Sequence, residues 1–596
     1  MASTDRPALL GIERSVTGRR GRQRGDDTGN DNLALAIAQK HGLPDLVGRL
    51  LAARGIATDE VPLYLEPTLR DLLPNPSRFL DMDKAVARLV AAIGANEKIV
   101  VWGDYDVDGA TSTALLQRYF ASIGHPVGRY IPDRIREGYG PNSPALLKLR
   151  EEGAAVVVTV DCGITAHEPL AAAEAAGLDV IVLDHHQSEP QLPPAHAIVN
   201  PNRLDEEPGF GQLAAVGVTF LVLVGLNRAL REAGHFATRR EPDLLELLDL
   251  VALGTVCDVV PLTGLNRALV SQGLRIAARR GNVGMAALAD IARMETAPGT
   301  FHLGFMIGPR LNAGGRVGEA DLGARILSTG DPGEANRIAL HLDALNDERR
   351  AIEQQVLDRA MAAIGEEPPS APLTFVAEAG WHPGVIGIVA SRLVERYGRP
   401  ACVVALADGI GKGSGRSMPG LDLGAAVIAA RQSGLLVNGG GHAMAAGFTV
   451  AEENLPAQQS FLGERLLQMN AGNIDVARTL GIDGPLAAGA VDLALAERIA
   501  ALGPFGSGNP EPRFALSGVR ILRADAMGKD HLRCFVAGSD GKQVRAVAFR
   551  VGGTPLGELL ASRGGGMPVH LAGHLRAETW QGRTSVRFFI EDAAPA

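Results

Sequence analysis

The sequence is poor in cysteine and in long apolar runs, and each shortage excludes a class of protein. Its four cysteines are Cys162, Cys257, Cys402 and Cys534, and their spacing shows no pairs. A disulfide framework and a zinc knuckle are therefore not expected, and the chain fits the reducing cytoplasm. The longest apolar runs, at residues 213–226 and 244–260, are interrupted well before the roughly 20 residues that a membrane span requires. We expect no membrane association.

The start of the chain also lacks the apolar segment of a secretory signal. Arginines are frequent in residues 1–30, and acids such as Glu13 and Asp26 are interspersed among them. We interpret these residues as a disordered tail.

The chain has no excess of basic residues and few aromatic ones. Lysine and arginine number 58 against 67 aspartates and glutamates, which gives a net charge of −9. This charge excludes a surface coated with basic residues for nucleic acid, so any such contact has to be local. Aromatic residues make up only 4% of the chain, which limits base stacking as a source of affinity. Phosphate contacts would dominate, with strong salt dependence and little sequence preference.

The length of 596 residues exceeds what one hydrophobic core supports, so we expect a modular protein. Composition and patterning divide it into a tail and helical lead-in (residues 1–75), an α/β domain (76–240), a helical region with a connector helix (241–365), a smaller α/β domain (366–455) and a β-barrel (473–594).

The first α/β domain contains apolar, β-branched runs that alternate with helical stretches. Strands are predicted at residues 98–102, 155–160 and 179–183, and helices at 111–123 and 165–176, which is the pattern of a parallel sheet with crossover helices. The three strands are followed by Asp104, Asp161 and Asp184. Because ligands bind at the carboxyl ends of such strands, we expect these acids in one crevice.

Further helices are predicted at residues 213–233 and 243–253, and a long amphipathic helix, interpreted as a rigid spacer, at 334–364. The proline-rich stretch 366–372 ends the long helix and opens the smaller α/β domain, with strands near residues 373–376 and 401–405. The last domain is predicted as a small barrel of the OB type, a frequent platform for single strands. Its alternating strands lie at residues 514–522, 531–536, 544–549, 569–575 and 585–590.

The strongest chemical signal is a set of acids and histidines in the first half of the chain. Hard carboxylates with a few imidazoles suit a pair of Mn²⁺ or Mg²⁺ ions, and imidazole favours Mn²⁺. Two such ions about 3.5–4 Å apart activate a water and hold the oxygens of a phosphodiester. The set therefore predicts phosphoester hydrolysis. Its members are Asp104, Asp106, Asp108, Asp161, Asp184, His185, His186 and Asp258.

Each part of this set has a simpler interpretation. The run from Asp104 resembles half of a calcium-binding EF-hand loop, but the twelfth position is Leu115 instead of an acid. A single aspartate, such as Asp161 or Asp258, is often only a helix N-cap, and a histidine pair is more often structural. Three acid-bearing strand ends in one sheet, one of them followed by two histidines, favour a metal site. Gly411 and Lys412 are not followed by Ser or Thr, which excludes a P-loop.

Nine short sequence motifs, spread over nearly the whole chain, resemble those of the DHH phosphoesterase family. Within that family they are most similar to the motifs of the bacterial single-strand DNA exonucleases. The matching runs, in order, are GDYDVDGATST (residues 103–113), EGYGPN (137–142), VTVDCGIT (158–165), VLDHH (182–186), GTVCDVVPL (254–262), GPRLNAGGR (308–316), GSGRS (413–417), GGGHAMAAG (439–447) and GPFGSGNPEPRF (503–514). The implied fold is α/β: a parallel-sheet DHH domain, joined by a long helix to a smaller α/β DHH-associated domain and followed by an OB-like barrel.

The resemblance also implies roles for individual residues. The implied metal ligands are Asp106, Asp108, Asp161, His185 and Asp258, with Asp161 between the two ions. His186 would face the phosphate, and Asp104 would orient ligands or water. Some relatives have a histidine where this chain has Trp102, which would weaken the binding of one metal.

Substrate contacts are expected from arginines and glycine-rich segments. Arg310, Asn312 and Arg316 lie in a glycine-punctuated segment that brings guanidinium groups and backbone amides up to phosphates. The resemblance assigns Ser414 and Arg416 to a pocket for the 5′-terminal phosphate, with Arg134 beside them, and His442 to the far side of the cleft. The simpler interpretation is a solvated surface charge for each arginine and a turn for each glycine run.

The resemblance implies a metal-dependent exonuclease that degrades single-stranded DNA from 5′ to 3′ in DNA repair and recombination. A helicase and a single-strand-binding protein are candidate partners that would deliver the strand. One alternative is a DHH phosphodiesterase for short oligonucleotides or cyclic dinucleotides, but such enzymes generally lack the barrel. The other is a non-catalytic single-strand-binding module, which would be expected to lose acids that are all present here.

Overall fold

The computed structural model describes residues 7–25, 30–134, 136–365, 371–469, 479–580 and 583–596. The chain forms two compact units, which are described separately: Leu73–Asp475 is one, and Met1–Leu72 with Val476–Ala596 is the other. Within the described ranges, no helix has both the length and the apolar character needed to cross a bilayer.

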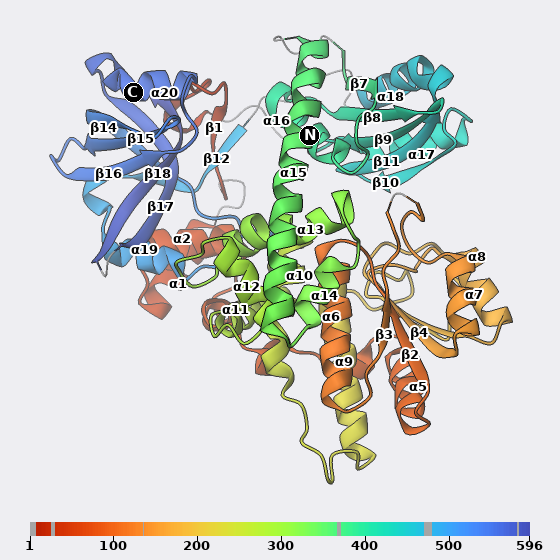
Figure 1. Ribbon diagram of the computed structural model, residues 1–596. Coiled ribbons are helices and arrows are strands. Elements are labelled where there is room, and N and C mark those ends of the chain that lie inside the picture. Colours follow the sequence, from red (N-terminus) through yellow and green to blue (C-terminus); the bar gives the residue numbers. More distant parts are fainter. Residues whose placement is uncertain (1–6, 26–29, 135, 366–370, 470–478, 581–582) are drawn as a thin grey trace. The chain divides into compact units, whose positions relative to one another are not determined.

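The first sheet of the unit Leu73–Asp475 is parallel and has five strands in the order β3-β2-β4-β5-β6. The three predicted strands are confirmed, and two short edge strands that were not predicted flank them. Helices α7 and α8 cover one face and α6 and α9 the other (Figure 1). The elements are β2 (Lys98–Trp102), α6 (Val107–Ser122), β3 (Gly128–Tyr130), α7 (Ser143–Glu151), β4 (Ala154–Val160), α8 (His167–Ala175), β5 (Asp179–Leu183), β6 (Ala197–Val199) and α9 (Ala215–Glu232).

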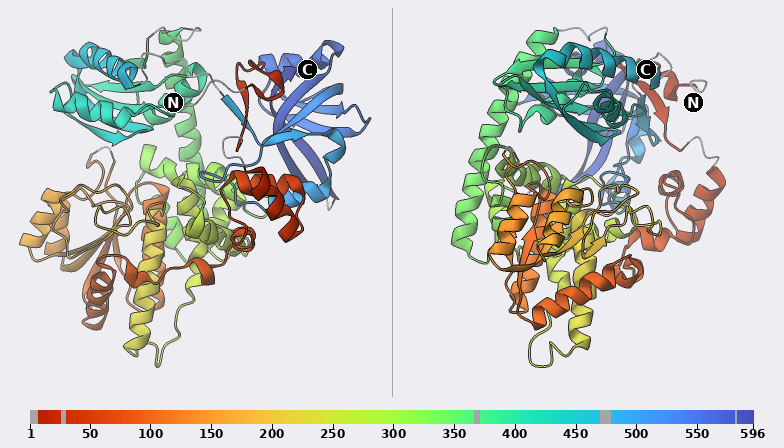
Figure 2. Two further views of the ribbon diagram at one scale, coloured as in Figure 1. Left: turned by 180° about the vertical axis from the view of Figure 1, so that it is seen from behind. Right: turned by 90° about the vertical axis from the view of Figure 1, so that its right-hand side faces the viewer.

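A helical region follows the sheet. It comprises α10 (Leu248–Cys257), α11 (Gly264–Ala277), α12 (Val283–Ile291), the π-helix His302–Ile307, α13 (Gly308–Val317), α14 (Leu322–Ser328) and α15 (Pro332–Ile364). The glycine-punctuated segment is thus helix α13, which continues directly from the π-helix. The predicted spacer is α15, and it runs from this region to the second sheet (Figure 2).

The second sheet has the order β10-β11-β9-β8-β7, and only the pair β7–β8 is parallel. Its glycine-rich runs are strands instead of turns, because neighbouring side chains cover their glycines. A Cβ atom on Gly413 would lie 2.0 Å from the ring of Phe448, and one on Gly415 would lie 2.6 Å from Leu423. The elements are β7 (Thr374–Ala379), α16 (Ile386–Tyr397), β8 (Ala401–Ala407), β9 (Ile410–Arg416), α17 (Leu423–Gln432), β10 (Asn438–His442), β11 (Ala445–Ala451) and α18 (Leu455–Met469).

The other unit contains a closed barrel, and its five predicted strands are confirmed. The pairing β14–β17 closes the ring β14-β15-β16-β18-β17, in which only β16 and β18 are parallel. A helix between β16 and β17 and the short strand β13 beside β14 complete the OB arrangement. The elements are β13 (Gly484–Leu486), β14 (Phe514–Met527), β15 (His531–Ala537), β16 (Gln543–Ala548), α20 (Pro555–Ala561), β17 (Val569–Trp580) and β18 (Arg583–Pro595).

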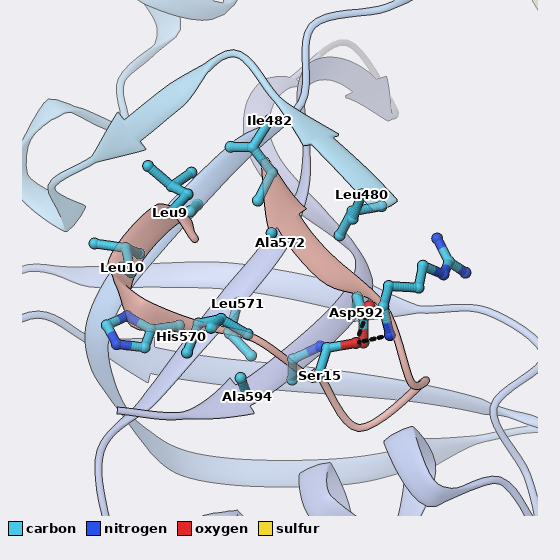
Figure 3. Close-up of a pocket in the computed structure, with 15 residues that line it drawn as sticks. Leu9, Leu10, Ser15, Leu480, Ile482, His570, Leu571, Ala572, Asp592 and Ala594 are labelled. Atoms are coloured by element: carbon cyan, nitrogen blue, oxygen red, sulfur yellow. Dashed lines mark hydrogen bonds between the residues drawn. The ribbon is translucent and has the colours of Figure 1, made fainter. Parts of the chain in front are cut away.

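The N-terminal segment belongs to this barrel unit, and the prediction of a disordered tail is wrong for residues 7–25. Strand β1 (Arg20–Gln23) pairs in parallel with β12 (Thr479–Ile482). The Ser15 hydroxyl donates a hydrogen bond to the buried carboxylate of Asp592 at 2.7 Å. Leu9 and its neighbours line a cavity of only about 30 Å³ against the barrel (Figure 3). Apolar residues among the arginines therefore bind this segment to the barrel; residues 1–6 and 26–29 lie outside the described residues.

Candidate metal centre

The predicted acids and histidines converge at the carboxyl-end edge of the first sheet. Asp104 and Asp106 follow β2, Asp161 follows β4, and His185 and His186 follow β5. Asp108 lies in the first turn of α6 and Asp258 directly after α10. The acids that follow the strands therefore meet at one edge of the sheet, as predicted.

His185 lies at the middle of the cluster. Its Nε2 atom is 3.3 Å from Asp161 Oδ1, 3.6 Å from Asp258 Oδ2 and 4.0 Å from Asp108 Oδ2. Three groups each bring their ligand atoms within 4.8 Å of one another: Asp161 with His185 and His186, Asp108 with His185 and Asp258, and Asp104 with Asp106 and Asp161. Asp161 belongs to two groups, as a residue between two ions would.

The unsatisfied atoms of this cluster fit a divalent metal site. Asp104 Oδ1, His185 Nε2 and Asp258 Oδ2 are buried and have no hydrogen-bond partner among the described residues. Burial and the charge of neighbouring acids raise the pKa of Asp108 to about 7 and that of Asp258 to about 9. The same causes raise the pKa of Asp161 well above its usual value. Buried carboxylates that repel one another stay ionised at neutral pH only beside a cation, and oxygen with imidazole nitrogen suits Mn²⁺ or Mg²⁺.

Two of the acids also cap helices. Asp106 is the N-cap of α6 and accepts a hydrogen bond from the Gly109 amide at 3.1 Å. The carboxylate of Asp108 accepts from the amides of Ala215 and Val216, in the first turn of α9, at 2.7 and 2.9 Å. The helix ends thereby hold these carboxylates in place. The N-cap interpretation considered for Asp161 and Asp258 is wrong, since Asp161 precedes a loop and Asp258 is the C-cap of α10.

Asp184 is a positioning residue that was not among the predicted site residues, although it belongs to the acidic set. It is fully buried and accepts hydrogen bonds from the amides of Ile164, His185 and His186 and from His186 Nδ1, the last at 2.8 Å. Burial alone would raise its pKa, but these bonds and the neighbouring histidines lower the pKa to about 2. Asp184 therefore holds both histidines toward the cluster.

Tyr139 was also missed, because the motif EGYGPN indicates no role for it. Its hydroxyl donates a hydrogen bond to the backbone carbonyl of Asp161 at 2.7 Å and lies 3.3 Å from His186 Nδ1. Asp161 has a left-handed backbone with φ of 61°, which costs of order 1 kcal/mol for a residue other than glycine. The tyrosine thus clamps the strained backbone of the acid that belongs to two of the three groups.

Trp102 is a core residue. It is completely buried and stacks on Tyr130, with ring centroids 4.3 Å apart, in the core under α7 and α8. Its indole offers no ligand atom to the cluster. Asp104 lies nearer to the candidate metal ligands than a residue that only orients them would, since its ligand atom groups with those of Asp106 and Asp161.

Several predicted substrate residues form a cationic cluster beside the acids. Burial and the neighbouring guanidinium groups of Arg134, Arg349 and Arg416 lower the pKa of Arg316 to about 10. Arg316 also donates to the Gly384 carbonyl of the second α/β domain at 2.9 Å. The guanidinium of Arg134 lies over the ring of Tyr105, 5.0 Å from its centroid.

The remaining predicted substrate residues lie on the second sheet. Arg416, on β9, donates to Ser414 Oγ at 3.1 Å. His442 lies on β10, and its pKa is lowered by partial burial and by the nearby charges of His186 and Arg416. The structure therefore brings Ser414, Arg416 and His442 to one place.

Two further predicted substrate residues, Arg310 and Asn312, lie on helix α13. Arg310 pairs with Asp343 of α15 at 2.8 Å and also donates to the Met306 carbonyl, so its guanidinium ties two helices together. Asn312 is half-buried on the same helix. The prediction that the amides of this segment reach phosphates is wrong, because the helix uses them in its own hydrogen bonds.

Comparisons with known proteins agree with this arrangement. Three family models match: the DHH family N-terminal domain at residues 98–255, the DHHA1 domain at 371–467 and the RecJ OB domain at 482–592. The chain is 38% identical to the single-stranded-DNA-specific exonuclease RecJ of Dickeya dadantii, over 93% of this chain and 96% of the relative. For the Escherichia coli protein of that name the identity is 36%, over 93% and 96%.

A solved structure extends the likeness to three dimensions. The crystal structure of RecJ in complex with Mn²⁺ from Thermus thermophilus matches with a TM-score of 0.78 and 31% identity, over 94% of this chain and 78% of that chain. The Mg²⁺ complex from the same source gives 0.73 and 30%, over 95% and 77%. The predicted fold class is thereby confirmed. With its acidic sheet edge, its DHHA1 sheet and its barrel, the chain belongs to the RecJ family of DHH phosphoesterases.

Proposed function

We propose that the protein is a metal-dependent exonuclease that hydrolyses single-stranded DNA from 5′ to 3′. The observation that carries this proposal is a set of buried ligand atoms that lack a hydrogen-bond partner among the described residues and lie beside a cluster of arginines. Relatives at 35–38% identity that carry the name single-stranded-DNA-specific exonuclease support it.

The metal site is assigned to the acids and histidines at the sheet edge. Asp106, Asp108, Asp161, His185 and Asp258 would hold two Mn²⁺ or Mg²⁺ ions, with Asp161 between them. When bound, such ions polarise a phosphodiester and lower the pKa of a water. His186 is bonded to Asp184 through Nδ1, which leaves its Nε2 atom for an oxygen of the scissile phosphate.

The arginines supply a pocket for a terminal phosphate. Ser414 and Arg416 lie on β9 next to Gly387, where a Cβ atom would come within 2.9 Å of both side chains. Glycine at this position therefore lets the start of α16 approach both side chains without a collision. A 5′-phosphate held by Arg416, with Arg134 and Arg316 nearby, would place the first phosphodiester at the acids. Because the 5′ end is held, degradation would run from 5′ to 3′, and each cleavage would release one nucleotide.

We place this activity in DNA repair and recombination in the cytoplasm, with the strand delivered by a helicase or a single-strand-binding protein. The barrel opposes the alternative of a phosphodiesterase for dinucleotides. The complete set of converging acids opposes a non-catalytic binding module.

The test is an assay of 5′-labelled and 3′-labelled single strands and duplexes, with Mn²⁺ or with EDTA. The wild type is expected to release the 5′ label first, as a mononucleotide, only with metal and only from single strands. Asp161→Ala should be inactive, whereas Asp347→Ala, at an exposed aspartate of α15, should match the wild type. Cleavage in EDTA or full activity of Asp161→Ala would refute the metal assignment, and a preference for dinucleotides would favour the first alternative.

A further inference from the structure

Two exposed phenylalanines form a stacked pair on the helical region of the unit Leu73–Asp475. The rings of Phe301 and Phe305 lie with centroids 5.2 Å apart and planes 23° apart. Their exposed fractions are 62% and 66%. In a chain with only 4% aromatic residues, an exposed pair with parallel rings requires an explanation, because burial is the usual state of phenylalanine.

The pair lies on the outer face of a helix that packs against the metal centre. The inner face of the π-helix His302–Ile307 contacts the end of α10: Cys257 Sγ donates to the Leu303 carbonyl at 3.5 Å. Cys257 directly precedes Asp258 in the chain. Residues four apart share a helix face, so both phenylalanines point away from α10. Single π-helical turns occur often at functional sites.

The surrounding segment has the opposite charge to the protein as a whole. Residues 264–317 contain seven arginines and two acids, Asp290 and Glu295, although the chain carries a net charge of −9. Four of these arginines are exposed: Arg275, Arg279, Arg280 and Arg293. A cavity of about 300 Å³, lined by Arg280, Ile307 and residues 294–298, opens beside the π-helix. Arg280 is paired with Asp290 at 2.6 Å and Glu295 lines the cavity, but the segment keeps a net positive charge, which suits a phosphate backbone.

We infer that Phe301 and Phe305 form a stacking site for nucleobases of the single strand that approaches the metal centre. This inference rests on the proposed function and adds a base contact to it. Every base has a π-face, so the site accepts any sequence, and unpaired bases expose that face whereas paired ones cover it. The helix that carries the two rings contacts Cys257, next to Asp258, and the surrounding segment is positively charged. Both features favour a single strand over a protein surface as the partner that binds the rings.

The experiment compares the wild type with the double variant Phe301→Ala/Phe305→Ala. Fluorescence anisotropy in EDTA measures the binding of a single-stranded oligonucleotide and of an abasic strand of the same length and charge. The wild type should bind the base-carrying strand more tightly. The variant should bind that strand at least about fivefold more weakly and the abasic strand equally well. The salt dependence should stay unchanged, because phosphate contacts are retained.

Two controls accompany the variant. Phe301→Tyr/Phe305→Tyr keeps the rings and should bind as the wild type does. Leu340→Ala removes a similarly exposed apolar side chain, 59% exposed on α15, and should have no effect. Equal losses on both strands, or no loss on either, would overturn the inference. A changed oligomeric state in sedimentation with unchanged strand binding would instead make the pair an interface between copies.

The cleavage assay separates the two hypotheses. If the wild type cleaves single strands with Mn²⁺ but the alanine variant binds as the wild type does, only the stacking site fails. If the wild type does not cleave them at all, the proposed function itself fails.

Discussion

The two units each contain a cluster of charged residues, and the clusters differ in how their carboxylates are partnered. In the barrel, Glu591 contacts His574 at 3.1 Å and Arg513 at 2.5 Å, and although burial opposes the change these partners lower its pKa to about 2. At the sheet edge of the other unit, Asp108 and Asp258 have raised pKa values because burial and neighbouring acids dominate.

The difference between the two clusters separates structural from functional charge. A buried carboxylate with cationic partners inside the protein stabilises the fold that supplies them. Buried carboxylates that face one another cost free energy unless an ion from outside joins them. Four predictions test this distinction, in decreasing order of the expected effect.

The largest effect is expected from Asp161→Asn, which keeps the shape of the side chain and removes its charge. Nuclease activity should fall at least about a hundredfold, since loss of even a supporting residue around a metal costs about 10–100-fold. In EDTA the variant should melt at a higher temperature than the wild type, because one repelling charge is gone. Added Mn²⁺ should stabilise the wild type but not the variant. Asp347→Asn is the matched control, and a lower melting temperature in EDTA would contradict the account of unpaired acids.

Tyr139→Phe removes only the hydroxyl that clamps the Asp161 backbone. Affinity for Mn²⁺ in calorimetry should fall by about 10–100-fold, and kcat at limiting metal should fall with it while KM for DNA stays constant. Tyr397→Phe, which removes a hydroxyl bonded to the Gly365 carbonyl, should leave both unchanged. Unaltered Mn²⁺ affinity in Tyr139→Phe would show that the clamp is dispensable.

Arg416→Ala tests the cationic cluster that faces the acids. The preference for a 5′-phosphorylated over a 5′-hydroxyl strand should fall about tenfold, which corresponds to a charge-assisted hydrogen bond of about 1.5 kcal/mol. Arg310→Ala should instead lower the melting temperature, because it breaks the pair with Asp343, and should keep the preference. If Arg310→Ala lost the preference and Arg416→Ala kept it, Arg310 would be the phosphate-binding residue and Arg416 the structural one.

The smallest effect is expected from Glu591→Gln in the barrel. A carboxylate whose pKa is depressed from 4.5 to about 2 contributes stability that is full above pH 4.5 and is lost as the pH falls toward about 2. Because the side chain is 35% exposed, we expect about 1 kcal/mol after allowance for screening. The variant should lose this pH dependence in urea denaturation and retain metal binding. A loss of Mn²⁺ affinity would contradict the separation of the two clusters.

The sequence anticipated much of the fold, because its regular elements have local signatures. The strands β2, β4 and β5 consist of apolar, β-branched runs, and an acid follows each of them. The long helix α15 shows its apolar period and ends before the proline-rich stretch. The barrel strands alternate clearly enough to be placed. Their convergence at one sheet edge follows from parallel pairing alone for the three acid-bearing strands, so the candidate metal site could be placed before its geometry was known.

Other features could not be predicted, because they depend on partners that are distant in the sequence. The glycine-rich run at Gly413 is a strand because Phe448 covers it, and Arg310 is tied up by Asp343. Residues 7–25 are held on the barrel by apolar contacts of Leu9 and by the hydrogen bond from the Ser15 hydroxyl to Asp592, far along the sequence. Periodicity carries no information on such pairs.

Local spacing and side-chain type are thus enough to identify the residues that carry the chemistry and the strands that present them. Only folding selects which charges are partnered and which are left for an outside ligand. It placed the Tyr139 clamp on Asp161, the four hydrogen bonds on Asp184 and the stacked phenylalanines on the helix that contacts Cys257. The physical reason is that a carboxylate or a ring acquires its role from the atoms within a few ångströms of it, and folding alone selects those atoms.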